Sequence, residues 1–480
     1  MTIRFPYHTF PGQSCLQKIK SFIRKFRPSL ITGLFIFFMG NGWLLIPVSV
    51  MAQSFQKTDT IESFTLDQCI DYAFKHQPGL NMAIINQSIT KTTNAINLSG
   101  WYPQVNLGGN LTHYFELPTS LAGDSQNNGA PVKVHTGIVN TFIPALTVTQ
   151  AIFSPDLVYA SKSAKFFIKQ SEQITDSAKI NMVSIVSKSF YNLLLTIAQI
   201  EVLKEDTALL AKTYNDAYNQ YIAGLVDMTD YQEAAITLNN AKAQLKQAVE
   251  NVVPQYATLK QYMGHPPRSR FNVIFDTLQM KNDISFDTTQ ELVFERRIEY
   301  QILQTSKILQ HQVTDYYKST FLPTVSAFFN YNFEFESNSV AALYSNLYPY
   351  SFGGISLSVP IFTGFYRTNN IKRARLQEQL LDWNQVALRS EIYTEYTTAL
   401  ASYKGNLYNL YVMQDNTALA KNVYGIVTLQ YEQGVVPYLN VITAESNLIN
   451  SQIGYLNALY SVLSSKIDLQ KSMGFININH

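Results

Sequence analysis

The 480-residue sequence predicts an α+β membrane protein made of two copies of one structural unit. Three observations predict this class: an internal repeat, two long segments with few helix-breaking residues, and four segments that alternate between apolar and polar residues. In the repeat, eight residues recur 210 positions later without a gap: Tyr221, Gly224, Val226, Ala234, Leu238, Leu259, Met263 and Gly264 return as Tyr431, Gly434, Val436, Ala444, Leu448, Leu469, Met473 and Gly474. Such a duplication favours a pseudo-symmetric object over a catalytic domain with one unique pocket.

A second block of the repeat lies upstream and has a different spacing. Pro103, Val105, Asn110, Phe115 and Glu116 reappear 220 positions later as Pro323, Val325, Asn330, Phe335 and Glu336. The first copy therefore carries about ten extra residues between the two blocks. We expect these residues in a loop.

Residues 1–52 predict a secretory signal peptide. They contain six basic residues and no acid, and an uncharged run extends from Ser29 to Gln53. Val50 and Ala52 fit a cleavage site before Gln53. An uncleaved membrane anchor is the alternative, because the segment from Leu30 to Val50 is about as long as a spanning helix. In both cases the rest of the chain leaves the cytoplasm.

Composition excludes several classes of function. Without the six basic residues of the signal, 30 Lys and Arg remain against 34 Asp and Glu, so the mature chain has a net charge of −4 and we expect no nucleic acid partner. The seven histidines show no paired metal-ligand spacing, and phosphate-binding and nucleophile-elbow motifs are absent from the sequence. We therefore expect no enzyme activity, no catalytic residue, no metal and no cofactor. Cys69 is the single cysteine after the signal, so it cannot form an internal disulfide.

Four strands are predicted, at 103–116, 138–153, 323–336 and 352–362. From Thr324 to Phe335, apolar residues alternate with polar ones, with one interruption at Phe328. Strands of about ten residues with one apolar and one polar face suit a membrane barrel with a wet lumen. A soluble sandwich edge would alternate in the same way, and a single strand does not decide between them. Since no uninterrupted apolar run of 18 residues follows residue 53, the sequence argues against helical membrane spans.

Two long segments predict helices roughly 100 Å in length. Tyr159 to Ala223 contains neither Gly nor Pro, and the matching run from Phe365 to Gln433 contains only Gly405 and Gly425. Apolar residues form two neighbouring stripes on the last helix, which indicates packing on two sides, as in helices that close into a ring. A long helical bundle with a conventional core is the alternative.

These elements divide the chain into a signal peptide (1–52), a first repeat (53–286) and a second repeat (287–480). Each repeat is predicted to contain a helix, two strands, a long helix, a turn and a final helix. Pro103 and Pro323 mark the changes from helix to strand, because proline ends a helix and permits a strand to start. The turns, or tips, lie near Gly224 and Gly434.

The chain resembles the TolC family of outer membrane efflux ducts over nearly all of its mature length. Residues 64–78 are similar to the opening helix of that family, and the turns at 221–226 and 431–436 are similar to its periplasmic tips. Val359-Pro360-Ile361-Phe362-Thr363-Gly364, followed by Asn370 to Ala374, is similar to its strand-to-helix motif. The order of these motifs, their duplication and the export signal together carry the resemblance.

The resemblance implies a homotrimer in the outer membrane of a Gram-negative bacterium. Three protomers would contribute four strands each to a 12-stranded β-barrel in outer membrane lipid, continuous with a long periplasmic α-helical barrel. Loops at 117–137 and 337–351 would face outside. The implied function is the outer membrane channel-tunnel of a tripartite efflux or type I secretion system, whose partners are a periplasmic adaptor (membrane fusion) protein and an inner membrane pump. The alternative is a non-conducting periplasmic or surface coiled-coil structural protein.

The resemblance also implies sites at the periplasmic end. The family closes this end with acidic residues, which correspond here to Asn440 and Thr443, so this chain departs from the pattern. Because Asn and Thr carry no charge, we predict a constriction that is less sensitive to divalent cations and to acid. Asp230 matches a position that bonds to the second tip; Tyr431 is its expected partner in a tip latch, and a solvated surface carboxylate is the alternative. The tip residues expected to contact the adaptor are Gly224, Leu225, Val226, Gly434, Val435 and Val436.

Overall fold

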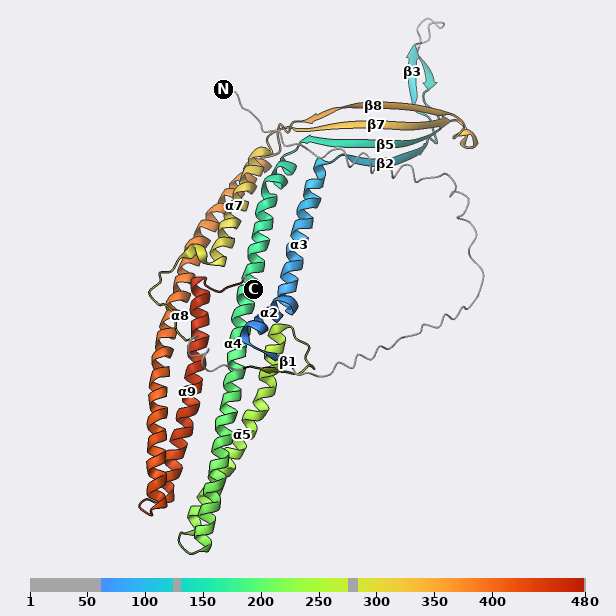
Figure 1. Ribbon diagram of the computed structural model, residues 1–480. Coiled ribbons are helices and arrows are strands. Elements are labelled where there is room, and N and C mark those ends of the chain that lie inside the picture. Colours follow the sequence, from blue (N-terminus) through green and yellow to red (C-terminus); the bar gives the residue numbers. More distant parts are fainter. Residues whose placement is uncertain (1–61, 124–130, 275–283, 479–480) are drawn as a thin grey trace, which may run out of the picture. The chain divides into compact units, whose positions relative to one another are not determined.

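The computed structural model describes residues 62–123, 131–274 and 284–478, and the predicted signal peptide lies outside these residues. Long helices and one four-stranded sheet make up most of this part of the chain (Figure 1). The helices are α2 (Leu66–His76), α3 (Pro78–Leu98), α4 (Pro155–Ile222), α5 (Met228–Met263), α7 (Ile298–Ser319), α8 (Tyr366–Glu432) and α9 (Tyr438–Met473). The strands are β1 (Glu62–Phe64), β2 (Gln104–His113), β3 (Thr119–Gly123), β4 (Pro131–His135), β5 (Asn140–Phe153), β6 (Phe271–Val273), β7 (Thr324–Ser337) and β8 (Leu347–Ser358).

The four-stranded sheet is antiparallel and has the order β2-β5-β7-β8. Strands β2 and β5 form a hairpin of the first copy, and β7 and β8 form the equivalent hairpin of the second. The central pairing of β5 with β7 joins the two copies into one sheet (Figure 1). Strands β2 and β8 are therefore its two edges.

The register of the sheet aligns residues of one kind across neighbouring strands. Val105 pairs with Val148, which pairs with Phe329. One position along, Asn106 pairs with Thr147, and the Thr147 hydroxyl donates to Asn330 Oδ1 at 2.7 Å. Because successive side chains of a strand point to opposite faces, these rows give the sheet one apolar and one polar face.

The predicted boundaries differ most from the structure in β8 and in the first loop. Strand β8 begins and ends earlier than the predicted 352–362, since residues 347–351 pair with β7. Its early end precedes Pro360, which has no N–H group to donate to a ladder. The predicted loop at 117–137 contains the short hairpin of β3 and β4, so part of the extra length of the first copy is folded.

The long helices have closely matched lengths in the two copies. Helices α4 and α8 contain 68 and 67 residues, and α5 and α9 contain 36 residues each. Helix α4 packs along α5, and α8 packs along α9, as two helical hairpins (Figure 1). Helix α4 also packs along α9, which joins the two hairpins. Packing on two sides accounts for the two apolar stripes that the sequence shows on the last helix.

Helix α4 is the one helix among the described residues whose length and composition would allow it to cross a membrane. Polar residues are scattered through the segment, so it contains no uninterrupted apolar run of 18 residues and was not predicted as a span. Half of its most apolar stretch is buried inside the protein. Val186, Phe190 and Leu193 of α4 belong to a buried cluster together with residues of α2, α5 and α9. Packing in this core accounts for the apolar character of the segment.

Each copy ends with the same glycine contact. Gly264 ends α5 with φ of 71°, and Gly474 ends α9 with φ of 75°, both in the left-handed region. A Cβ atom on Gly264 would lie 2.3 Å from the carbonyl oxygen of His76, and one on Gly474 would lie 2.9 Å from that of Arg296. The two copies therefore repeat not only residues but also the close contact between the last helix and a backbone carbonyl group.

Candidate functional site

The two helical hairpins end in turns of the same geometry. In both, the helix closes with a glycine in the left-handed region, Gly224 with φ of 73° and Gly434 with φ of 71°. The same two backbone hydrogen bonds, each 2.9 Å long, close both turns: Gly224 N to Tyr221 O and Leu225 N to Gln220 O, and Gly434 N to Tyr431 O and Val435 N to Gln430 O. This is the Schellman arrangement, in which glycine avoids the steric cost of a left-handed residue.

Apolar side chains point into solvent at both turns. Leu225 is 76% exposed and Val435 is 70% exposed. A Cβ atom on either turn glycine would meet no neighbouring atom within 4 Å. The tips that the sequence predicts as contact sites are therefore apolar and uncovered within the protomer.

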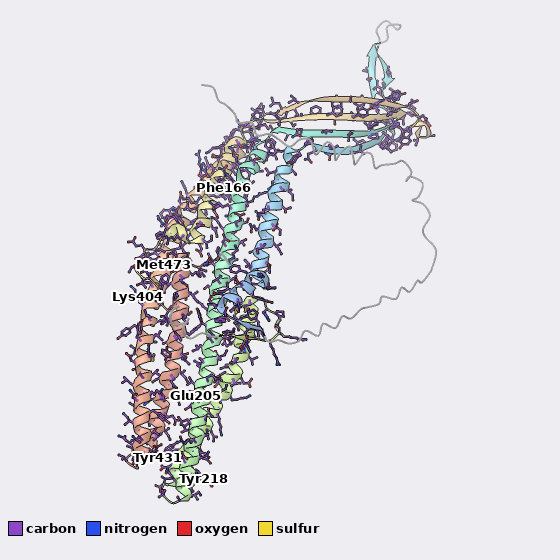
Figure 2. All side chains as sticks on the ribbon, in the orientation of Figure 1. Phe166, Glu205, Tyr218, Lys404, Tyr431 and Met473 are labelled. Carbon is purple, nitrogen blue, oxygen red and sulfur yellow. The ribbon has the colours of Figure 1, made fainter. Side chains whose placement is uncertain are left out.

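Among the described residues of this protomer, the Tyr431 hydroxyl is not hydrogen-bonded to Asp230. The hydroxyl of Tyr431, the residue labelled at the end of α8 in Figure 2, instead donates to Gln220 Oε1 at 2.9 Å, so α8 bonds to the last turn of α4. Burial, followed by the negative charge of Asp230, raises the pKa of Tyr431. Asp230 therefore lies near the phenol and acts on it through its charge. Tyr431 packs in a cluster with Ala217 of α4, and this packing brings its hydroxyl to the end of that helix.

Asn440 and Thr443 lie on one exposed face of α9. Thr443 donates its hydroxyl to the carbonyl oxygen of Leu439 at 2.9 Å, within the helix. Tyr438, Val441 and Glu445 are buried on the opposite face. Neither Asn440 nor Thr443 is engaged by the other hairpin, so both side chains remain available on this surface.

A polar crevice of about 320 Å³ separates the ends of α4 and α8. It is lined by Lys212, Asp216 and Gln220 of α4 and by Tyr424, Tyr431 and Glu432 of α8, among others. Beside this crevice, a buried apolar cluster of residues from α4, α5 and α9, together with the Tyr431–Gln220 bond, joins the two hairpins.

Sequence reasoning missed two buried acids near this crevice, Asp206 of α4 and Glu445 of α9. Their side chains are 7% and 2% exposed. A signal was present in the sequence, because Glu445 follows Ala444 within the apolar stripe of the last helix. The polar residues Ser446 and Asn447, which are exposed, follow Glu445 directly. The spacing of apolar residues therefore did not predict that Glu445 is buried.

The edges of the four-stranded sheet form a second candidate site. Every residue of β2 and of β8 is exposed. Apolar side chains lie along both edges; Leu107 of β2 is 74% exposed and Ile355 of β8 is 71% exposed. Within the described part of the chain, the outer side of each edge strand has no strand partner.

The fold is similar to that of solved outer membrane proteins. It resembles the outer membrane protein VceC of Vibrio cholerae, with 16% identity and a TM-score of 0.66 over 85% of this chain and 96% of that chain. It also resembles the CmeC outer membrane channel of Campylobacter jejuni, with 18% identity and a TM-score of 0.68 over 86% and 87% of the two chains. The open state of the MtrE outer membrane channel of Neisseria gonorrhoeae gives 16% identity and a TM-score of 0.67 over 85% and 88%. No curated protein matches the sequence.

At these identities the likeness shows the fold, which is that of solved outer membrane proteins. Residues 69–265 and 314–475 match the outer membrane efflux protein family, and the chain belongs to that family. The resemblance to TolC-type ducts is thereby confirmed, and the protein is an outer membrane efflux channel protein of a Gram-negative bacterium.

Proposed function

We propose that three copies of this chain assemble into a channel-tunnel that passes substrates from an inner membrane pump and a periplasmic adaptor protein to the exterior. The observation that carries this proposal is the pair of open sheet edges, β2 and β8. Lipid offers no hydrogen-bond partner to a free strand edge, so a membrane sheet must close on itself. Four strands are too few for a barrel, and three copies would give twelve, with β2 of one protomer beside β8 of the next.

Exposed apolar side chains on the helices support the same assembly. Met82, Ile85 and Ile89 of α3 are 55–60% exposed, and Trp383 and Tyr408 of α8 are each 73% exposed. Neighbouring protomers would cover such surfaces in a closed ring of helices. A non-conducting coiled-coil protein would leave the half-apolar sheet without a purpose, and family membership favours the channel.

The tips would form the periplasmic end of the channel. The exposed Leu225 and Val435 would contact the adaptor, because uncovered apolar side chains are typical of protein interaction sites. Asn440 and Thr443 would line the constriction as uncharged groups. Tyr431 would hold the tips closed through Gln220, with Asp230 close to its phenol.

Channel formation can be tested in a planar bilayer. The mature protein, purified in detergent as a heat-modifiable trimer, is expected to give discrete single-channel currents that Mg²⁺ changes little. Asn440→Asp is expected to make the current sensitive to Mg²⁺, because three carboxylates near one axis attract divalent cations. A folded trimer without conductance would contradict the channel and support the structural alternative.

The revised latch gives a separate prediction. Tyr431→Phe removes the hydrogen bond to Gln220, which is worth about 1 kcal/mol, and is expected to raise the fraction of time the channel spends in a wide state about fivefold. Gln220→Ala is expected to have the same effect. Asp230→Ala is the matched control and is expected to change the open fraction less than either. Equal widening by all three variants would show that Asp230 is part of the latch.

A further inference from the structure

Two carboxyl groups are buried in the zone where the helical hairpins pack against each other. Asp206 Oδ1 and both carboxyl oxygens of Glu445 are buried without a hydrogen-bond partner, and so is the hydroxyl of Tyr438. Buried carboxylates are normally paired with a cation or satisfied by hydrogen bonds, because removing an unpaired charge from water is costly. Ionising these two acids in one interface is therefore costly.

The packing of α4 against α9 brings the two acids close together. Gln199 donates to Asn457 at 3.1 Å, and Lys188 forms an ion pair with Asp468, so the two helices run antiparallel in a fixed register. Continued toward the tips, this register places Glu445 five residues from the position opposite Asp206, or about one and a half helical turns along α9. The two groups therefore belong to opposite hairpins and share one buried zone.

The carboxyl groups that face this zone from the other helices are also negative. Glu233 of α5 acts on Tyr438 of α9, and Glu432 of α8 acts on Tyr424. Lys212 of α4 lines the crevice beside Tyr424, but among the described residues it forms no ion pair with Asp206 or Glu445. Among the described residues, no cation lowers the pKa of either acid.

Burial raises the pKa of Asp206 to about 6. Burial, followed by the charge of Asp206, raises the pKa of Glu445 to about 8, compared with an ordinary value of 4.5. Glu445 therefore holds its proton at neutral pH while the hairpins are packed. In separated hairpins, water would reach both groups, and their pKa values would return toward the ordinary range.

We propose that Asp206 and Glu445 form a proton-controlled contact, in which the two hairpins stay packed near their tips while the pair holds a proton and separate when both groups are ionised. Separation of the hairpins would open the periplasmic end of the channel, and this consequence rests on the proposed function. The contact between the hairpins does not depend on it. The side chains of Asn440 and Thr443 do not titrate, so the constriction that they would line would not itself respond to pH.

The direction of the pH effect follows from the two states. The packed state holds more protons than the separated state at any pH between the ordinary and the raised pKa values. Below about pH 4 both states are protonated, and pH has little effect. As the pH rises from about 4 toward 8, the equilibrium constant that favours packed over separated hairpins falls by up to about tenfold per pH unit for each proton released. The contact is thus strongest in acid and is lost as the pH passes 8.

The experiment measures the distance between spin labels at the two tips of the detergent-solubilised trimer. Leu225→Cys and Val435→Cys introduce exposed attachment sites, whereas Cys69 is fully buried. The distance between the tips is expected to be short at pH 5.5 and to lengthen at pH 8.5. In Glu445→Gln, which mimics the protonated acid, the short distance is expected at both pH values. This readout does not require conduction, so it fails or succeeds independently of the channel proposal.

Glu205→Gln is the matched control, because Glu205 adjoins Asp206 on α4 and is exposed; Figure 2 labels its position. It is expected to keep the pH response of the wild type. A wild-type distance that does not change with pH would overturn the proposal, as would a response that survives in Glu445→Gln. If Glu445→Gln does not form trimers, Asp206→Asn takes its place, and the lengthening at pH 8.5 is expected to shrink at least severalfold; an undiminished response would again overturn the proposal.

Discussion

Gly264→Ala and Gly474→Ala are each expected to destabilise the folded protein by roughly 3 kcal/mol or more. Both glycines have a positive φ, and a Cβ atom would lie within 3 Å of a backbone carbonyl oxygen, of His76 in one case and of Arg296 in the other. A backbone group cannot swing aside like the end of a flexible side chain, so the helix end would have to move. The measurement is the temperature at which the trimer dissociates in detergent.

The turn glycines provide the matched control. Gly224 and Gly434 have nearly the same φ values, 73° and 71°, but open space surrounds them. Alanine there is expected to cost only about 1 kcal/mol, because the left-handed backbone is disfavoured and nothing is displaced. If all four substitutions lowered the dissociation temperature equally, the close backbone contacts would not be responsible.

Arg297→Met is expected to destabilise the protein by about 2 to 3 kcal/mol. The Arg297 side chain is 5% exposed and precedes α7 at the start of the second copy. Its guanidinium donates to Glu299 at 3.0 Å, to Glu395 of α8 at 2.7 Å, and to the carbonyl oxygen of Lys471 of α9 at 3.3 Å. It therefore joins three helices, and its loss leaves two carboxylates and a carbonyl group with fewer partners.

Arg296→Met is the control for this substitution. Arg296 is exposed and lies 4.9 Å from the ring centre of Phe475, a contact worth about 0.5 to 1 kcal/mol. Denaturant unfolding, or heat dissociation of the trimer, is expected to show a clearly larger loss of stability for Arg297→Met than for Arg296→Met. A similar loss in both would show that the buried network contributes no more than a surface contact.

The sequence indicated most of the elements because each depends on local chemistry. The absence of helix breakers between Tyr159 and Ala223 predicts a helix, and α4 covers that segment. The repeated glycines predict two equivalent turns, and Gly224 and Gly434 have matching dihedral angles. Alternation in the strands predicts a two-faced sheet, because side chains of a strand point to opposite sides.

Partners that lie far apart in the sequence were harder to predict. The packing of the end of α8 against the first hairpin decides that Tyr431 meets Gln220 of α4 rather than Asp230 of α5, and a change of one helical turn would exchange such partners. The burial of Glu445 likewise depends on which face of α9 meets the other hairpin. The hairpin of β3 and β4 lies in a stretch of the first copy whose alternation is too short to signal strands.

The sequence by itself determined the duplication, the order of helices and strands, the position of both tips and the class of protein. These follow from residue spacing, from glycine and proline, and from apolar periodicity, which act over a few residues. The tertiary structure alone decided the joining of the two copies through β5 and β7, the bond between Tyr431 and Gln220, and the placement of two unpaired acids between the hairpins. These depend on how long elements are aligned with one another, and that alignment is set by packing over the whole length of the helices.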